Sequence, residues 1–121
     1  MRQRTWIILL AIYAAGIGYV SHQPIDAGVP PFPHFDKVFH LAEFGLFMFL
    51  AWRATGRRLL LGWILTLAFA ATDEWHQAMI PMRNASLFDF LADSVGASLV
   101  AAVLHRRILL WRFFSARILG R

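Results

Sequence analysis

Four long apolar segments alternate with short polar or proline-containing connections along the whole chain. They cover residues 5–20, 37–52, 59–80 and 87–104. As helices they are long enough to cross the ~30 Å hydrocarbon layer of a bilayer, the shortest with help from snorkelling flanks. Only helices and closed barrels satisfy every backbone hydrogen bond in lipid. The pattern therefore predicts an all-α, four-helix transmembrane bundle in a single domain, residues 1–121.

The connections support this division. Residues 21–35 carry four of the five prolines, and Pro30, Pro31 and Pro33 exclude a regular helix there. Asp36 follows as a plausible N-cap of the second helix. A basic turn at 53–58 and a polar turn at 81–86 separate the remaining helices. The basic start and first apolar segment have the outline of a signal peptide, but no small-x-small cleavage site closes the segment, so we expect a retained span.

The last segment, 105–121, mixes arginines with large apolar residues. At about 100° per residue, Arg106, Arg107, Arg117 and Arg121 share one face, whereas Arg112 does not. This pattern is typical of a basic amphipathic helix that lies on an anionic membrane surface. We therefore expect a C-terminal interfacial helix after the fourth span.

Composition and charge strengthen the membrane interpretation. The chain is 59% hydrophobic and 16% charged, too apolar for a soluble domain of 121 residues. It contains no cysteine, which excludes disulfides and thiolate metal sites. The net charge of +5 comes from residues that flank the apolar segments. That placement indicates membrane topology rather than nucleic acid binding, so we expect no nucleic acid partner.

The basic residues predict an orientation. Ten of the twelve lie before the first segment, between the second and third, or after the fourth; the other two are Lys37 and Arg83. The positive-inside rule then places both termini in the cytoplasm. The proline-rich connection and the turn at Pro81 should face outward.

All seven acidic residues fall on the outward side of that topology, as do four of the five histidines. They are Asp26, Asp36, Glu43, Asp73, Glu74, Asp89 and Asp93, with His22, His34, His40 and His76. Glu43 should lie ~10 Å and Asp73 ~12 Å inside the ends of their helices, given 1.5 Å of rise per residue. At such depth an unpaired ionisable group costs roughly 2–3 kcal/mol or more. These side chains should therefore pair with one another or face water.

Helical spacing gives each of the last three helices a polar stripe. One contains Asp36, His40 and Glu43, the next Asp73, His76 and Gln77, and the last Asp89, Asp93 and Gly96. Packing the stripes together predicts a polar pocket open to the outside. Arg83 above it and Lys37 at its rim would take a phosphate or a carboxylate. Gly96 would allow close approach of a neighbouring helix.

Two interpretations of this chemistry stay open. His40, Glu43, Asp89 and Asp93 could hold a divalent metal, or they could form a hydrogen-bonded network that neutralises the acids and pairs the helices. No closed ligand motif favours the metal, so no cofactor is assured. Asp73 with His76 could be an acid/base pair, or His76 could reach the headgroup region. Asp73 is preferred to its neighbour Glu74 because it shares a face with Gln77.

These residues carry a family resemblance. Asp36-Lys37-x-x-His40, Asp73-Glu74-x-x-Gln77-x-x-x-Pro81-x-Arg83 and Asp89-x-x-x-Asp93-x-x-Gly96 resemble, in order and spacing, the VanZ-like family of small bacterial membrane proteins. Asp93 departs from the family pattern, which usually has Asn there. The resemblance implies a protein of the bacterial cytoplasmic membrane, linked through the founding member to resistance against the glycopeptide antibiotic teicoplanin.

Two functions are consistent with these patterns. In the first, the pocket binds the polar headgroup of a lipid-linked cell-wall precursor or of an amphiphilic antibiotic. Its lining would be Asp36, Lys37, His40, Glu43, Asp73, Gln77, Arg83, Asp89 and Asp93. In the second, the protein is a membrane-embedded hydrolase or transferase acting on such a lipid, with Asp73, His76 or His40 as acid or base. Membrane lipids are expected partners in both, and the oligomeric state stays open.

Overall fold

The computed structural model describes residues 1–23, 35–81, 83 and 85–118. They form four helices: α1 (Gln3–His22), α2 (Phe35–Ala54), α3 (Leu59–Ala78) and α4 (Leu87–Ile118). The described residues contain no strand. The predicted all-α architecture of four helices is confirmed.

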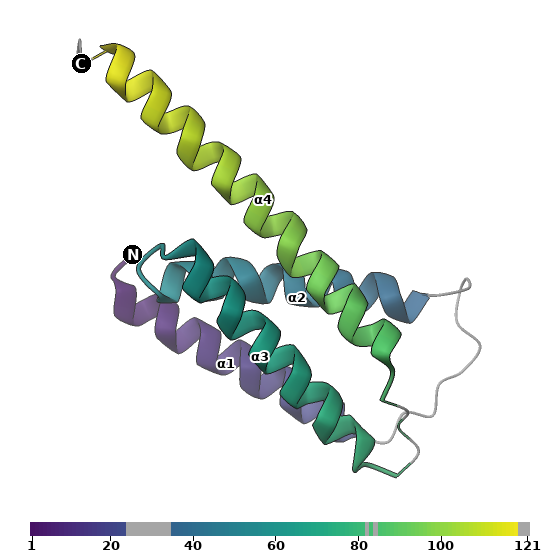
Figure 1. Ribbon diagram of the computed structural model, residues 1–121. Coiled ribbons are helices and arrows are strands. Elements are labelled where there is room, and N and C mark those ends of the chain that lie inside the picture. Colours follow the sequence, from purple (N-terminus) through teal and green to yellow (C-terminus); the bar gives the residue numbers. More distant parts are fainter. Residues whose placement is uncertain (24–34, 82, 84, 119–121) are drawn as a thin grey trace.

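The bundle is organised around α2, which contacts each of the other three helices. Helix α1 lies beside α3 and does not touch α4 within the described residues (Figure 1). Aromatic rings fill the contact between α2 and α3: Phe47 and Phe69 stack with centroids 4.6 Å apart. Ile17 of α1 completes this part of the core.

The closest helix contact is that of α4 on α2, and it depends on Gly96. A Cβ atom added to Gly96 would lie 2.1 Å from the backbone oxygen of Leu41 and 2.8 Å from its carbonyl carbon. No side chain fits there, because real Cβ contacts essentially never fall below 3.0 Å. The close approach expected at Gly96 is therefore present, and it brings the first turns of α2 and α4 together.

The turn between α2 and α3 reverses the chain with two residues in the left-handed region. Gly56 has a φ of 68° and Arg57 a φ of 66°. Glycine adopts this conformation at no steric cost, whereas an arginine rarely does. The Thr55 hydroxyl donates to the Ala51 carbonyl oxygen at 2.8 Å, which also accepts the Thr55 backbone N–H at 2.9 Å at the end of α2.

Helix boundaries differ from the expected ones at several ends. The fourth helix does not end at Leu104; it continues through the predicted tail to Ile118 as one helix. The reason is that no proline or glycine interrupts the chain between Ala97 and Ile118. The predicted tail is helical as expected, but it extends α4 past the other three helices (Figure 1).

The other differences are small. Helix α2 begins at Phe35, so Asp36 lies in its first turn rather than before it, and α3 ends at Ala78 rather than at Ile80. The proline-rich connection, with Asp26 and His34, lies outside the described residues over 24–34.

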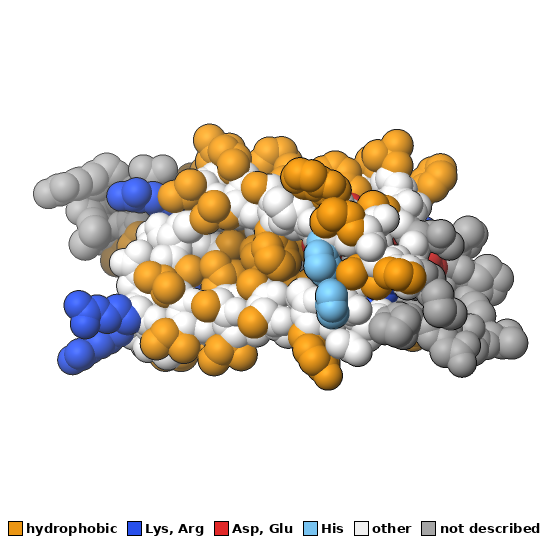
Figure 2. Space-filling model, turned by 90° about the horizontal axis from the view of Figure 1, so that it is seen from below, with side chains coloured by type: hydrophobic (Ala, Val, Ile, Leu, Met, Phe, Trp, Pro, Cys, Tyr) orange, Lys and Arg blue, Asp and Glu red, His pale blue; other side chains and the backbone are white. Residues whose placement is uncertain are grey.

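The two ends of the bundle differ in charge, and its sides are apolar. Gln3 donates to the Ala54 carbonyl oxygen at 2.9 Å, and the Arg53 guanidinium lies 4.2 Å from the Trp6 ring centroid. These contacts bring the N-terminus to the arginine-rich turn. Figure 2 shows the basic side chains at one end of a largely hydrophobic face.

Helices α1 and α4 are long and apolar enough to cross a membrane. Outward-facing side chains such as Ile8, Ile12 and Leu99 are more than half exposed, which an apolar solvent tolerates far better than water. The acidic residues of α2 and α3 lie in the parts of these helices that are far from the arginine-rich turn.

Candidate functional site

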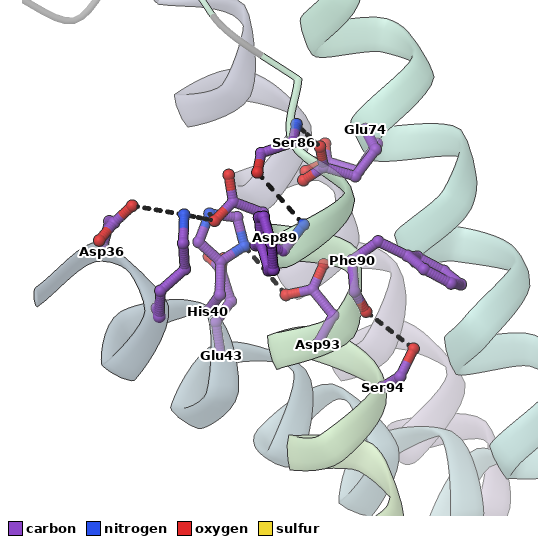
Figure 3. Close-up of polar contacts among 12 residues, drawn as sticks. Asp36, His40, Glu43, Glu74, Ser86, Asp89, Phe90, Asp93 and Ser94 are labelled. Carbon is purple, nitrogen blue, oxygen red and sulfur yellow. Dashed lines mark hydrogen bonds and ion pairs between the residues drawn. The ribbon is translucent and has the colours of Figure 1, made fainter. Parts of the chain in front are cut away.

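Six polar side chains from three helices meet at that acidic end (Figure 3). We call them the α2–α4 cluster: Asp36, Lys37, His40, Glu74, Asp89 and Asp93. Helix α2 supplies the first three at spacings that place them on one face, and α4 supplies Asp89 and Asp93 one turn apart. The Gly96 contact lies about one turn further along α4 than Asp93, so it fixes the separation of these two helices directly below the cluster.

The innermost pair is His40 with Asp93. The His40 Nδ1 atom lies 2.9 Å from Asp93 Oδ1, and Asp93 is fully buried. With Asp93 ionised and His40 neutral, His40 donates the Nδ1 proton to Asp93 and its Nε2 carries the lone pair. That Nε2 faces the other α4 carboxylate, with Asp89 Oδ1 4.0 Å away. The pair therefore orients a basic nitrogen into the cluster.

Lys37 is the cation of the cluster and it is already engaged. Its Nζ atom donates to Asp36 Oδ2 at 2.7 Å and to Asp89 Oδ1 in a very short contact. At the exposed rim, the side-chain hydrogen bond from Lys37 lowers the pKa of Asp36 below its ordinary value. The cluster still has four carboxylates for one ammonium, so it is electronegative.

Glu74 joins the cluster from α3. Its Oε2 accepts the backbone N–H of Ser86 at 2.9 Å. Ser86 also caps α4, since its hydroxyl accepts the Phe88 N–H at 3.2 Å. The other oxygen of Glu74, Oε1, is buried and has no hydrogen-bond partner among the described residues, and the same holds for Asp93 Oδ2. Buried unpaired acceptors are rare and costly. We therefore expect both oxygens to have a partner outside the described residues.

Asp73 belongs to a second group on the other side of α3. Its Oδ2 accepts from the Ser21 hydroxyl at 3.0 Å and from Gln77 Nε2 at 2.8 Å. Nearby, the His76 ring stacks on His22 with centroids 5.4 Å apart. We call Ser21, Asp73 and Gln77 the α1–α3 group. His76 thus contacts another histidine, and the described residues show no hydrogen bond or ion pair between His76 and Asp73.

Glu43 lies between the two groups and close to His40 (Figure 3), whereas Arg83 lies apart from both. The half-buried Glu43 side chain is within electrostatic range of Asp73 on one side and Asp93 on the other. Arg83 does not hang over the cluster: its Nε donates to the Gln23 carbonyl oxygen at 3.0 Å, and its Nη2 donates to that of Val20. Arg83 thereby caps the C-terminal end of α1, where unpaired carbonyl groups attract a cation.

The structure therefore divides the single predicted pocket into two polar groups. The pocket predicted from sequence did not include Glu74, because Asp73 and Glu74 point about 100° apart on α3 and only one face of that helix was expected to face the pocket. Helix α3, however, has α1 on one side and α2 with α4 on the other, so both directions are inward. Ser21 and Ser86 were missed as well. The Ser86-x-x-Asp89 spacing, which is typical of a capping box, was the available signal.

The cluster has the donor set of a divalent cation site. His40, Glu74 and Asp89 each offer one ligand atom, and these three atoms lie within 4.8 Å of one another. This set shares His40 and Asp89 with the one expected from sequence, while Glu74 stands where Glu43 and Asp93 were expected. Asp93 instead bonds to the far side of the His40 ring, as carboxylates do behind histidines that bind metals.

Comparison with protein families gives a match to the VanZ/LLP1 family model over residues 3–112. The chain belongs to the VanZ/LLP1 family. This confirms the resemblance seen in the motifs around Asp36, Asp73 and Asp89 and extends it over nearly the whole chain. Comparisons with curated proteins and with solved structures gave no match. With the apolar helices α1 and α4, family membership indicates a VanZ-like membrane protein.

Proposed function

We propose that this VanZ/LLP1 protein binds the polar headgroup of a membrane amphiphile in the α2–α4 cluster, at the outward side of the bacterial cytoplasmic membrane. The ligand class is a lipid-linked cell-wall precursor or an amphiphilic antibiotic. The family-level link to teicoplanin resistance favours this class. Both kinds of molecule place a polar, hydrogen-bonding headgroup at the membrane surface, at the level of the helix ends that carry the cluster.

The observation that carries this proposal is the incomplete neutralisation of the cluster. Ionisable side chains near the end of a membrane helix are costly unless they are paired. Four carboxylates face one lysine, and Glu74 Oε1 and Asp93 Oδ2 lack partners among the described residues. A purely structural network would be expected to satisfy its members, because a partly satisfied one destabilises the bundle. A ligand with hydroxyl, ammonium or metal-bound groups would complete it.

The proposed orientation can be tested by itself. The chain has no cysteine, so single cysteines report topology without background. A cysteine in place of Arg57 should react with a membrane-impermeant maleimide only after the cells are opened, and one in place of Ala85 should react in intact spheroplasts. The reverse pattern would contradict the outward placement of the cluster.

Binding is tested by titrating purified protein in phosphatidylcholine nanodiscs with a fluorescent polyprenyl-linked glycan probe and, separately, with teicoplanin. His40→Gln removes the inward-facing nitrogen and should weaken binding of the true ligand tenfold or more. Thr72→Ala alters an exposed side chain on the same end of α3 and should bind as the unaltered protein does. Equal affinity of His40→Gln and the unaltered protein for both probes would refute the proposal.

A second candidate function is catalysis on the same class of lipid. The specific observation that favours it is the His40–Asp93 pair, which holds a basic Nε2 in a fixed direction at the mouth of the cluster. General bases are oriented in this way by a buried carboxylate. Release of headgroup or phosphate from the polyprenyl probe, lost in His40→Gln, would support an enzyme. Tight binding of intact probe without turnover would support the binding function alone.

A further inference from the structure

The geometry points to a divalent cation site formed by His40 Nε2 with carboxylate oxygens of Glu74 and Asp89, and we propose that the cation bridges the protein to a phosphate or hydroxyl oxygen of the headgroup. This inference rests on the proposed function, since it names how that same cluster holds its ligand. The ligand set differs from the one expected from sequence, because Glu74 takes the place of Glu43 and Asp93.

The spacing of the three ligand atoms fits an ion. All three lie within 4.8 Å of one another, whereas ligand atoms around a tetrahedral Zn²⁺ ion are roughly 3.4 Å apart. The three ligand atoms must therefore draw together by roughly 1 Å when the ion binds. One imidazole and two carboxylates suit Zn²⁺ or Mn²⁺.

A second observation is independent of the clustering. Glu74 is about nine-tenths buried, yet its Oε1 has no hydrogen-bond partner among the described residues. Its other oxygen is held by the Ser86 backbone N–H, which leaves Oε1 as the oxygen available to an ion. A buried carboxylate oxygen without a donor is the atom that a cation would satisfy.

The residues around the three ligands also fit the assignment. Asp93 fixes the His40 ring through Nδ1 and so leaves Nε2 for the ion. Lys37 contacts Asp89 Oδ1, the oxygen that also lies 4.0 Å from His40 Nε2, so the ion would bind the other oxygen of Asp89 or share Oδ1 with Lys37. With two more positive charges, the four carboxylates and one lysine come close to neutrality.

Three protein ligands leave at least one coordination position open. An oxygen of a headgroup phosphate or sugar would fill that position from the membrane surface. The cation thereby resolves a difficulty of the proposed function, namely that an electronegative cluster would otherwise repel a phosphate. Neither Arg83, which caps α1, nor Lys37, which is paired twice, is free to neutralise it.

The test is Mn²⁺ binding to the full-length protein in nanodiscs, followed as the loss of the free-ion electron paramagnetic resonance signal. We expect one saturable site that Zn²⁺ displaces. Glu74→Gln should raise the Mn²⁺ Kd at least tenfold, whereas Glu43→Gln should change it by no more than a few-fold because Glu43 contributes charge but no ligand atom. Thr72→Ala is the control on an exposed position.

Two further variants separate positioning from folding. Asp93→Asn keeps an oxygen that accepts the His40 Nδ1 proton and should retain most of the affinity. Asp93→Leu removes it and should weaken Mn²⁺ binding by about 10–100-fold. Circular dichroism of each variant shows whether it is folded, and His40→Gln provides a second loss-of-ligand variant if Asp93→Leu does not fold.

The outcomes distinguish this inference from the proposed function. No saturable Mn²⁺ or Zn²⁺ binding, or equal affinity of Glu74→Gln and the unaltered protein, would overturn the cation site. Headgroup binding that is unchanged by EDTA would overturn it too, while leaving the proposed function intact. Mn²⁺ binding without any headgroup binding would support the cation site and refute the proposed function. Headgroup binding that EDTA abolishes and Mn²⁺ restores supports both.

Discussion

Replacing Gly96 by alanine tests the contact that holds α2 and α4 together. The added Cβ atom would lie 2.1 Å from the Leu41 carbonyl oxygen and 3.0 Å from the Leu41 Cα, whereas ordinary contact begins at 3.4 Å. The obstructing atoms are backbone, so no side-chain rotation relieves the clash. The two helices must therefore separate by roughly 1 Å or more at this point. Overpacking of this kind costs about 1–3 kcal/mol.

The separation of α2 and α4 should also lengthen the contacts between these helices in the α2–α4 cluster, one turn away. The His40–Asp93 bond is 2.9 Å long, and a hydrogen bond lengthened by 1 Å is effectively lost. Gly96→Ala should therefore lower both the stability of the bundle and the affinity for ligand. Gly18→Ala is a matched control, because its added Cβ has nothing within 4 Å; as a glycine-to-alanine change inside a helix it should be neutral or stabilise by up to about 1 kcal/mol.

The assay is thermal unfolding in detergent, followed by circular dichroism and tryptophan fluorescence. At about 4–8 °C per kcal/mol for a small domain, Gly96→Ala should lower Tm by at least several degrees. Gly18→Ala should keep or raise it. If Gly96→Ala unfolds at the same temperature as the unaltered protein, the close packing of α4 on Leu41 is not as described here, and the geometry of the cluster above it loses its support.

Two further substitutions test the residues that lie outside the α2–α4 cluster. Arg83→Ala removes two charge-assisted hydrogen bonds to the end of α1 and should lower the free energy of unfolding, measured with a chemical denaturant, by about 1–2 kcal/mol. The folded variant should keep its ligand affinity. A loss of affinity without a loss of stability would restore the anion-binding role expected from sequence. Asp73→Asn still accepts hydrogen bonds from Ser21 and Gln77 and should change the free energy of unfolding by less than about 1 kcal/mol. Asp73→Leu leaves those donors unpaired and should lower the free energy of unfolding by about 2 kcal/mol or more. Equal stability of the two variants would mean that the α1–α3 group contributes nothing to stability.

The helices were predictable because apolar length and proline placement are local signals. The pattern of residues 59–80 and the stop at Pro81 specify α3 within two residues. The end of α4 was not predicted, because the expected boundary at Leu104 marked the end of the apolar run. Helix formation depends on local propensity, which continues past His105. The end of an apolar run is therefore not a sign that the helix ends.

The site was predictable only in part. Spacing along one helix correctly placed Asp36 and His40 on a common face, and likewise Asp89 and Asp93. Spacing along one helix could not show that α3 is enclosed on two sides. Because it is enclosed on two sides, Asp73 and Glu74 lie in different polar groups. Arg83 was assigned to a ligand because the turn was expected above the pocket and a guanidinium suits a phosphate or a carboxylate. Its partners are carbonyl groups at the C-terminal end of α1, about sixty residues earlier.

Histidine signals provide the most direct measurement of whether the α2–α4 cluster is the ligand site. Protein with ¹³C-labelled histidine rings, in nanodiscs, is titrated with the headgroup probe, and the His40 signal is identified by its loss in His40→Gln. The account predicts that the His40 signal shifts and saturates with the probe while that of His105, twelve residues beyond Asp93 along α4, stays in place. Saturable binding that leaves the His40 signal unmoved would contradict it.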